Sequence, residues 1–258
     1  MVSAKNPVLV GKIRSITYFF NFTIEIFYQI IPTFKTKNVS ALVLLRQILF
    51  TGVEALTLTV FAALVIGALI IVQASAINPN FVHSQMLYSI LLIIITRELA
   101  TLIPALIVIA RSGTAISTEL GNMVINEEVE AILSFGISPI SYLVVPRVFA
   151  LVFSLLPLAF FFNFIGLFGA GIISFLFYDV DFMDFVLKLA VELSIKDILL
   201  TISKSVLFGL SIAIIACYNG LSVQKASTEV PQKTSRAVVE SIGTIIFIDV
   251  LLALLFQI

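Results

Sequence analysis

Charged side chains are scarce in this sequence. Lys, Arg, Asp and Glu make up 12% of its 258 residues, whereas 60% are hydrophobic, and the mean hydropathy is +1.16. A soluble domain of this size carries about 25% charged residues. The composition therefore excludes a soluble globular protein and predicts an integral membrane protein. The 15 basic and 15 acidic residues cancel, so nothing in the net charge indicates a nucleic-acid partner.

Cysteine and histidine occur once each, as Cys217 and His83. A single cysteine excludes an internal disulfide and a multi-cysteine metal site, and a single histidine excludes His-pair zinc motifs. The sequence also lacks the Walker A pattern, the G-x-S-x-G and H-E-x-x-H motifs, and the paired aspartates of an intramembrane protease. We therefore expect no catalytic residue, metal or cofactor on this chain, and any ATP-driven work would need a motor on another chain.

Long apolar runs predict five membrane-spanning helices. A spanning helix needs about 20 mostly apolar residues. Residues 55–96 contain no Asp, Glu, Lys or Arg and are interrupted only by "NPNFVHSQ", which predicts two spans joined by a short loop. The expected spans are about 54–76, 85–110, 148–173, 198–218 and 236–257. We therefore expect an all-α membrane protein that forms one domain over residues 1–258.

The segment 8–32 differs from these spans. Thr17, Asn21, Glu25 and Gln29 follow one another at i, i+4 spacing and so share one helical stripe. An amphipathic helix of this kind lies in the plane of the head groups with its polar stripe toward water. A sixth span is the alternative, but Pro32 and the basic "KTK" that follows favour a helix that stays at the interface. The polar residues in this segment and the lack of a cleavage site also argue against a signal peptide.

The distribution of basic residues predicts the orientation of the chain. They gather before the first span, at Lys5, Lys12, Arg14, Lys35, Lys37 and Arg46, and before the last, at Lys225, Lys233 and Arg236. The loop 77–84 has no basic residue, and the loop 178–197 has two lysines against five acidic residues. Because basic loops stay in the cytoplasm, the N-terminus is expected there, and five spans place the C-terminus outside.

A short cytoplasmic helix is expected over residues 126–135, between the second and third spans. Asn126 is a favourable N-cap, and Gly136 and Pro139 are stop signals. Val129, Ile132 and Leu133 are expected on one side of it. Acidic residues near the positive end of the helix dipole, Glu127, Glu128 and Glu130, suit docking into a soluble partner. The alternative is a loop helix that rests on the membrane.

Four ionisable residues lie inside the expected spans: Arg97, Glu98, Lys204 and Asp249. Each costs about 2.5–3.5 kcal/mol on insertion scales, so such residues indicate function. At 1.5 Å per residue, Glu98, Lys204 and Asp249 lie roughly 10–15 Å below the outer interface. We therefore expect a Glu98–Lys204–Asp249 network, with Arg97 left to bind an anion. Alternatively, the network only fixes helix register, and the two roles are compatible.

The cytoplasmic part of the second span carries small residues at four-residue spacing, Gly113, Ser117 and Gly121. Such a ladder permits close helix contact. Arg111 and Glu119 lie near the point where this helix leaves the membrane, and we expect them to form packing and salt-bridge contacts rather than to bind substrate.

Two blocks of the sequence form a recognisable pattern. The first, Arg97 to Arg147, reads "RELATLIPALIVIARSGTAISTELGNMVINEEVEAILSFGISPISYLVVPR", and the second is "CYNGLSVQKASTEVPQKTSRAVVESI". These blocks resemble the MlaE family, the permease subunits of ABC transporters that move phospholipids with MCE-domain partners. The chain length, the interfacial helix and the five spans also agree. The family usually reads Arg-Glu-Leu-Gly-Pro where this chain has Ala100 and Thr101, with Pro104 three residues later. This departure is expected to shift the helix break toward the cytoplasm.

The resemblance implies a homodimeric permease in the inner membrane of a double-membraned bacterium, with a periplasmic C-terminus. Two cytoplasmic ATPases, which hold the ATP and Mg, and a periplasmic ring of six MCE proteins would complete the transporter, often with a small cytoplasmic regulatory subunit. The helix 126–135 would be the coupling helix, with Ile132 and Leu133 among its contacts. The four intramembrane charges match charged positions of the family, and a cavity in the dimer would hold phospholipid on its way between inner and outer membranes, maintaining lipid asymmetry.

Two other classes of function remain open from the residues alone. A self-contained secondary transporter or channel could use the four charges as an ion relay, although the sequence lacks the internal repeat that such transporters usually show. A non-transporting scaffold subunit is the third reading.

Overall fold

The computed structural model describes residues 17–30, 41–77, 84–224 and 226–256, and these residues form an all-helical membrane protein. Five helical stretches among them are long and apolar enough to cross a membrane: Leu44–Ile77, Gln85–Ile125, Ile140–Tyr178, Ile195–Leu221 and Glu229–Leu255. The prediction of five spans is confirmed. All five are longer than the expected ranges.

The first, fourth and fifth spans are single helices, α2 (Ala41–Ile77), α9 (Ile195–Leu221) and α10 (Glu229–Phe256). The second span is built from α3 (Gln85–Leu91), η2 (Leu92–Leu99), α4 (Ala100–Val108), η3 (Ile109–Gly113) and α5 (Thr114–Ile125), where η marks a π-helical stretch. The third consists of η4 (Ile140–Val144) and α7 (Val145–Tyr178). Two short helices, α6 (Glu128–Ser134) and α8 (Phe182–Glu192), follow α5 and α7.

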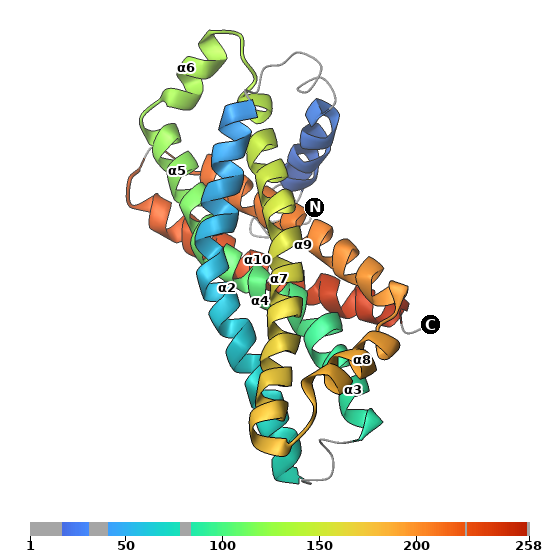
Figure 1. Cartoon of the computed structure of the whole chain (residues 1–258). Coiled ribbons are helices and arrows are strands. Elements are labelled where there is room, and N and C mark those ends of the chain that lie inside the picture. Colours follow the sequence, from blue (N-terminus) through green and yellow to red (C-terminus); the bar gives the residue numbers. More distant parts are fainter. Residues whose placement is uncertain (1–16, 31–40, 78–83, 225, 257–258) are drawn as a thin grey trace, which may run out of the picture.

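Helices α2 and α7 run side by side along the length of the molecule, and α9 and α10 cross them obliquely (Figure 1). Helix α6 and the N-terminal helix (residues 17–30) lie at one end, which we call the α6 end. Helices α3 and α8 lie at the other, the α8 end. Glycines allow α2 and α7 to touch: a Cβ atom on Gly67 would collide with the carbonyl oxygen of Gly166. The "GLFGAG" stretch of the third span is therefore a helix-crossing site.

The second span contains two wide π-helical turns, one on each side of Pro104. The first includes Arg97 and Glu98, and at its end the amide of Ala100 donates to the carbonyl oxygen of Ile95, five residues back. Proline has no N–H to donate to the carbonyl four residues before it, so it loosens the helix on that side. We expected the break to move toward the cytoplasm. The first wide turn instead lies before Pro104, on the two charged residues, and only the second, 109–113, follows it.

Helix α6 begins two residues later than expected. Asn126 ends α5 instead of capping α6, and Glu127 provides the turn between them with a left-handed backbone (φ 61°). The predicted stop is correct. Gly136 has φ 75°, its amide donates to Leu133, and the amide of Ile137 donates to Ile132. This pair of bonds is a Schellman motif, which requires a residue with positive φ.

Helix α8 was not expected, because residues 178–197 are rich in charge and were interpreted as a loop. Phe185 and Leu189 lie one turn apart and are both buried. Phe185 packs edge-on against Tyr88 of α3, with ring centroids 5.3 Å apart. The apolar pair Phe185 and Leu189, at i, i+4 spacing, is therefore the feature of the sequence that indicates this helix.

The N-terminal helix packs on the bundle at the α6 end. Ile26 is buried in the core, and Phe19 packs edge-on against Tyr218 of α9 at 5.1 Å between ring centroids. The expected polar stripe is largely solvent-exposed, and its last member, Gln29, accepts a hydrogen bond from Ser138 in the loop after α6. Residues 8–16, 31 and 32 of the expected segment lie outside the described residues.

Candidate functional site

Lys204 of α9 is completely buried and lies at the centre of a cluster of charged side chains. Its Nζ atom is 2.7 Å from Asp249 Oδ1 of α10 and 3.0 Å from Glu98 Oε2 of η2. The same atom donates to the carbonyl oxygen of Arg97 at 2.7 Å. The structure thus brings together the three residues that the depth comparison paired. A buried ammonium group requires such partners, because an unpaired charge in a low-dielectric interior is strongly destabilising.

The two carboxylates around Lys204 differ in their surroundings. The Asp249 side chain is only 12% exposed, and its Oδ1 atom forms an ion pair with Lys204 Nζ at 2.7 Å. The Glu98 side chain is 41% exposed and accepts a hydrogen bond from Lys204. Glu98 is therefore the carboxylate that a ligand can reach.

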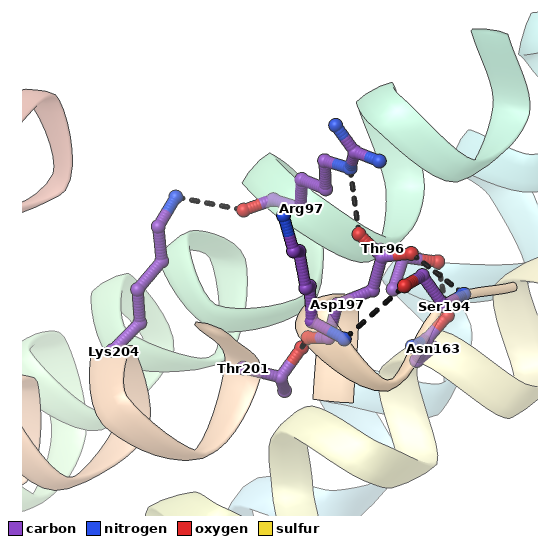
Figure 2. Close-up of polar contacts among 8 residues, drawn as sticks. Thr96, Arg97, Asn163, Ser194, Asp197, Thr201 and Lys204 are labelled. Carbon is purple, nitrogen blue, oxygen red and sulfur yellow. Dashed lines mark hydrogen bonds and ion pairs between the residues drawn. The ribbon is translucent and has the colours of Figure 1, made fainter. Parts of the chain in front are cut away.

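Arg97 has a protein partner, contrary to our expectation. Its Nε atom donates to Asp197 Oδ1 of α9 at 2.7 Å, and the Asp197 side chain is only 3% exposed (Figure 2). The prediction that Arg97 is left without a protein anion was wrong, because Asp197 was interpreted only as the residue where the fourth span meets the interface. The spacing of Asp197, Thr201 and Lys204, at i, i+4 and i+7, places all three on one face of α9 and was the available signal.

The start of α9 fixes Asp197 in place. Ser194 and Asp197 form a capping box: Ser194 Oγ accepts from the amide of Lys196, and Asp197 Oδ2 accepts from the amide of Ser194 at 3.0 Å. One carboxylate oxygen of Asp197 therefore caps the helix while the other holds Arg97. Such charge-assisted contacts are short and directional. This arrangement joins the end of α9 to the wide turn of the second span.

We call the five charged residues Arg97, Glu98, Asp197, Lys204 and Asp249 the charge cluster. A cavity of about 160 Å³ lies beside the cluster. Arg97, Glu98, Asp197 and Lys196 line it together with apolar residues of η2, α9 and α10. The cluster contains three acids and two bases, so it has one acidic group in excess. The side chain of Arg97 is 43% exposed, and Asp197 engages only its Nε. The cavity therefore presents both a guanidinium edge and a carboxylate, which can bind the oppositely charged parts of a polar ligand.

The residues expected to couple the protein to a partner gather on α6, which projects from the α6 end (Figure 1). Glu127, Glu128 and Glu130 are exposed. Val129 and Ile132 pack against the core, but Leu133 is 56% exposed. Leu133 therefore points away from the apolar side where we expected it. Phe135 is 80% exposed beside it. Helix α6 thus exposes both acidic and apolar side chains.

The small residues of the second span lie in a tight contact between α5, α9 and α10. Gly113, Ser117 and Gly121 are buried, and a Cβ on Gly220 would lie 2.8 Å from the carbonyl oxygen of Ser117. Near them, Arg111 pairs with Glu54 of α2.

Sequence reasoning missed Arg147 of α7. It is 5% exposed and pairs with Glu119 at 2.9 Å. Arg111 and Glu119 therefore connect helices, as expected. Within the described residues, no group of three or more His, Cys, Asp or Glu side chains could hold a metal ion.

Residues 44–255 match a family model described as Permease MlaE. Similar curated proteins include the probable ABC transporter permease proteins of Rickettsia prowazekii and Synechocystis. They are 29% and 30% identical over 213 and 214 residues, which is 83% of this chain in both cases and 82% and 81% of theirs. A protein of the same description from Pyropia yezoensis is 27% identical over 235 residues, which is 91% of this chain and 89% of that protein. The family model covers all five spans, the charge cluster and α6, and the chain therefore belongs to the MlaE permease family.

Proposed function

We propose that this chain is the permease subunit of an ATP-driven transporter that moves phospholipids between the inner and outer membranes. The observation that carries the proposal is the charge cluster, which borders a cavity inside the spans of a protein from a permease family. A lipid head group crosses the apolar layer only where polar groups replace its water. The cluster supplies such groups, and the apolar helix surfaces around them suit the acyl chains.

Helix α6 is the proposed contact with an ATPase. ABC transporter permeases are moved by separate ATPase subunits, and the relatives of this chain are named as such permeases. The exposed Glu128, Glu130 and Phe135 at the α6 end give a partner both charge and apolar surface. The left-handed turn at Glu127 joins α6 directly to α5, and α5 continues the span whose first wide turn carries Arg97 and Glu98. Movement of α6 would therefore be transmitted to the span that contains Arg97 and Glu98.

In this proposal the α6 end is cytoplasmic, the α8 end and the C-terminus are periplasmic, and the chain is a multi-pass inner-membrane protein. Two copies form a homodimer with two ATPases, which bind the ATP and Mg, and with a periplasmic hexamer of MCE-domain proteins. A small cytoplasmic regulatory subunit can complete the assembly. The distribution of Lys and Arg supports the orientation, and the whole chain acts as one permease domain without catalytic activity of its own.

The test is purification of the tagged chain from its native membranes in mild detergent, followed by mass spectrometry of the bound proteins and lipids. We expect an ATPase that carries a Walker A motif, an MCE-domain protein, and phospholipid. An assembly without any ATPase would contradict the proposal, and transport driven by an ion gradient in liposomes that contain this chain alone would favour a secondary transporter.

A further inference from the structure

A second pocket lies between the N-terminal helix, α9 and α10, and it shares no lining residue with the cavity of the charge cluster. It has a volume of about 560 Å³, and its wall is mainly aromatic and aliphatic, including Phe19, Phe20, Ile215 and Phe247. Ligand sites of proteins typically have volumes of about 300–1,000 Å³ and such apolar walls. This pocket, which we call the lateral groove, is therefore large enough for part of an amphiphile.

The lateral groove has one polar border. Arg236 Nε donates to Glu240 Oε1 at 2.7 Å, and Asn219 Nδ2 donates to Glu240 Oε2 at 2.9 Å. Asn219 is buried, with 2% of its surface exposed, so it fixes the Glu240 carboxylate from inside the protein. The Arg236 side chain is 59% exposed and is held by Glu240 only at Nε. Glu240 therefore orients the guanidinium through Nε and leaves its outer edge available. Such an edge can bind a phosphate through two parallel hydrogen bonds.

The position of the lateral groove fits the head-group level of a membrane. The N-terminal helix beside it exposes Tyr18, Phe20, Ile24, Phe27 and Tyr28, each at least half exposed, as an interfacial helix does. From Arg236 the groove follows α10 past Gly243 to Phe247, roughly 16 Å along the helix axis. A Cβ atom on Gly243 would meet no atom within 4 Å, so the floor of the groove is open there.

We propose that the lateral groove binds one phospholipid of the surrounding bilayer, with its phosphate on Arg236 and one acyl chain along Gly243 and Phe247. The chemistry of the border selects this occupant: Glu240 engages Arg236 only through Nε, so the other edge of the guanidinium stands at the head-group end of an apolar groove. The bound lipid fills the space between the N-terminal helix and α10 and holds that helix on the bundle. This site is separate from the transported lipid at the charge cluster, and it does not depend on the proposed transport function.

The absence of tryptophan from this chain gives a direct test. A Phe247→Trp variant in detergent micelles is titrated with phospholipid that carries bromine on its acyl chains, which quenches indole fluorescence on contact. We expect saturable quenching at low lipid content. Arg236→Gln should raise the half-saturating lipid content about tenfold or more, because a charge-assisted contact to the phosphate is lost. Gly243→Leu should abolish the saturable phase, because its Cβ atom would meet no protein atom within 4 Å and the rest of the side chain would occupy the groove.

Matched controls separate groove binding from general lipid contact. A Phe164→Trp variant places the indole at a 72% exposed site on α7, where quenching should rise without saturation and should not respond to Arg236→Gln. Val239→Leu, at a 70% exposed position of α10 outside the groove lining, should leave the titration unchanged.

Three results would overturn the proposal. One is quenching that Gly243→Leu does not alter. Another is equal quenching by brominated diacylglycerol, which lacks the phosphate. The third is quenching that occurs only after residues 1–14 are deleted or after two copies are separated. The groove would then be occupied by the N-terminal residues of the chain or by the second copy.

Discussion

Lys204 illustrates how this protein accommodates charge in an apolar interior. Its ammonium group is fully buried and lies close to two carboxylates and one carbonyl oxygen. Asp249 is nearly as buried as Lys204, whereas Glu98 borders the cavity. The Lys204–Asp249 pair is therefore the structural part of the cluster, and Glu98 is the part that a ligand can use.

A double-mutant cycle tests this division. Lys204→Met leaves two carboxylates without their cation and should cost about 3–5 kcal/mol of unfolding free energy, as for other broken buried pairs. Asp249→Leu should cost less, because Lys204 keeps Glu98. The double variant should be more stable than the sum of the two losses by about 1–3 kcal/mol. Unfolding by denaturing detergent in mixed micelles measures all three.

The exposed pair Lys188 and Asp184 on α8 is the control for this cycle. Its side chains are 42% and 51% exposed at 2.7 Å, so its coupling should be only about 0.3–0.5 kcal/mol. Additive losses for Lys204 and Asp249 would mean that these two residues do not stabilise each other.

At this scale the sequence predicted which acids surround Lys204 but not the partner of Arg97. Depth along a helix can be counted from the sequence, so Glu98, Lys204 and Asp249 could be placed at one level. Asp197 was assigned to the interface because it begins a helix. The wide turn of η2 determines where Arg97 and Glu98 lie, and counting residues along a regular helix does not predict a π-helical turn.

At the scale of helices, the number and order of the spans followed from the apolar runs, while their lengths did not. The second span was expected over about residues 85–110, yet its helical stretch continues to Ile125. Arg111 is accommodated by Glu54 of α2, a contact between distant parts of the chain that a local reading of the sequence does not contain. Helix α8 was missed because its segment is rich in charged residues and was interpreted as a loop. The pair Phe185 and Leu189, which packs it against the bundle, was not recognised.

Reversal of charge on α6 tests whether this helix contacts an ATPase. The variant Glu128→Lys/Glu130→Lys should lose the ATPase on purification while the permease keeps its elution profile in detergent, because both residues are exposed. Asp181→Lys/Asp184→Lys reverses two exposed acids of the α8 end and should keep the ATPase. Equal recovery of the ATPase with both variants would show that the acids of α6 are not part of the contact.

Two glycines in different helices should respond in opposite ways to the same substitution. Gly67→Ala places a methyl group against the carbonyl oxygen of Gly166 and should separate α2 from α7, with a loss of about 1–3 kcal/mol. Gly243→Ala meets no atom within 4 Å and should be neutral or stabilising by about 0.5–1 kcal/mol, because alanine favours helix. Thermal unfolding in detergent measures both, and an equal effect at the two positions would contradict the close crossing of α2 and α7.

At the scale of the whole molecule, the five spans differ in how much of their surface is buried against the rest of the chain. The most apolar windows of Leu44–Ile77 and Glu229–Leu255 are only 28% and 22% buried, against 56% for Ile195–Leu221. Uncovered apolar helix surface faces either lipid or another protein, and the proposed homodimer would use part of it. The sequence alone predicts that these helices lie in the membrane. Which helices pack against each other depends on contacts between residues that are far apart in the sequence.

In the proposed function, ATP hydrolysis by a partner drives phospholipid through this permease. The most direct measurement is transfer of a fluorescent phospholipid from proteoliposomes that contain the purified assembly to acceptor liposomes, with and without MgATP. We predict transfer that depends on MgATP, stops when the Walker A lysine of the ATPase is replaced, and falls at least tenfold with Glu98→Gln, which leaves the Lys204–Asp249 pair in place. Transfer at the same rate without ATP, or at a normal rate with Glu98→Gln, would contradict this account.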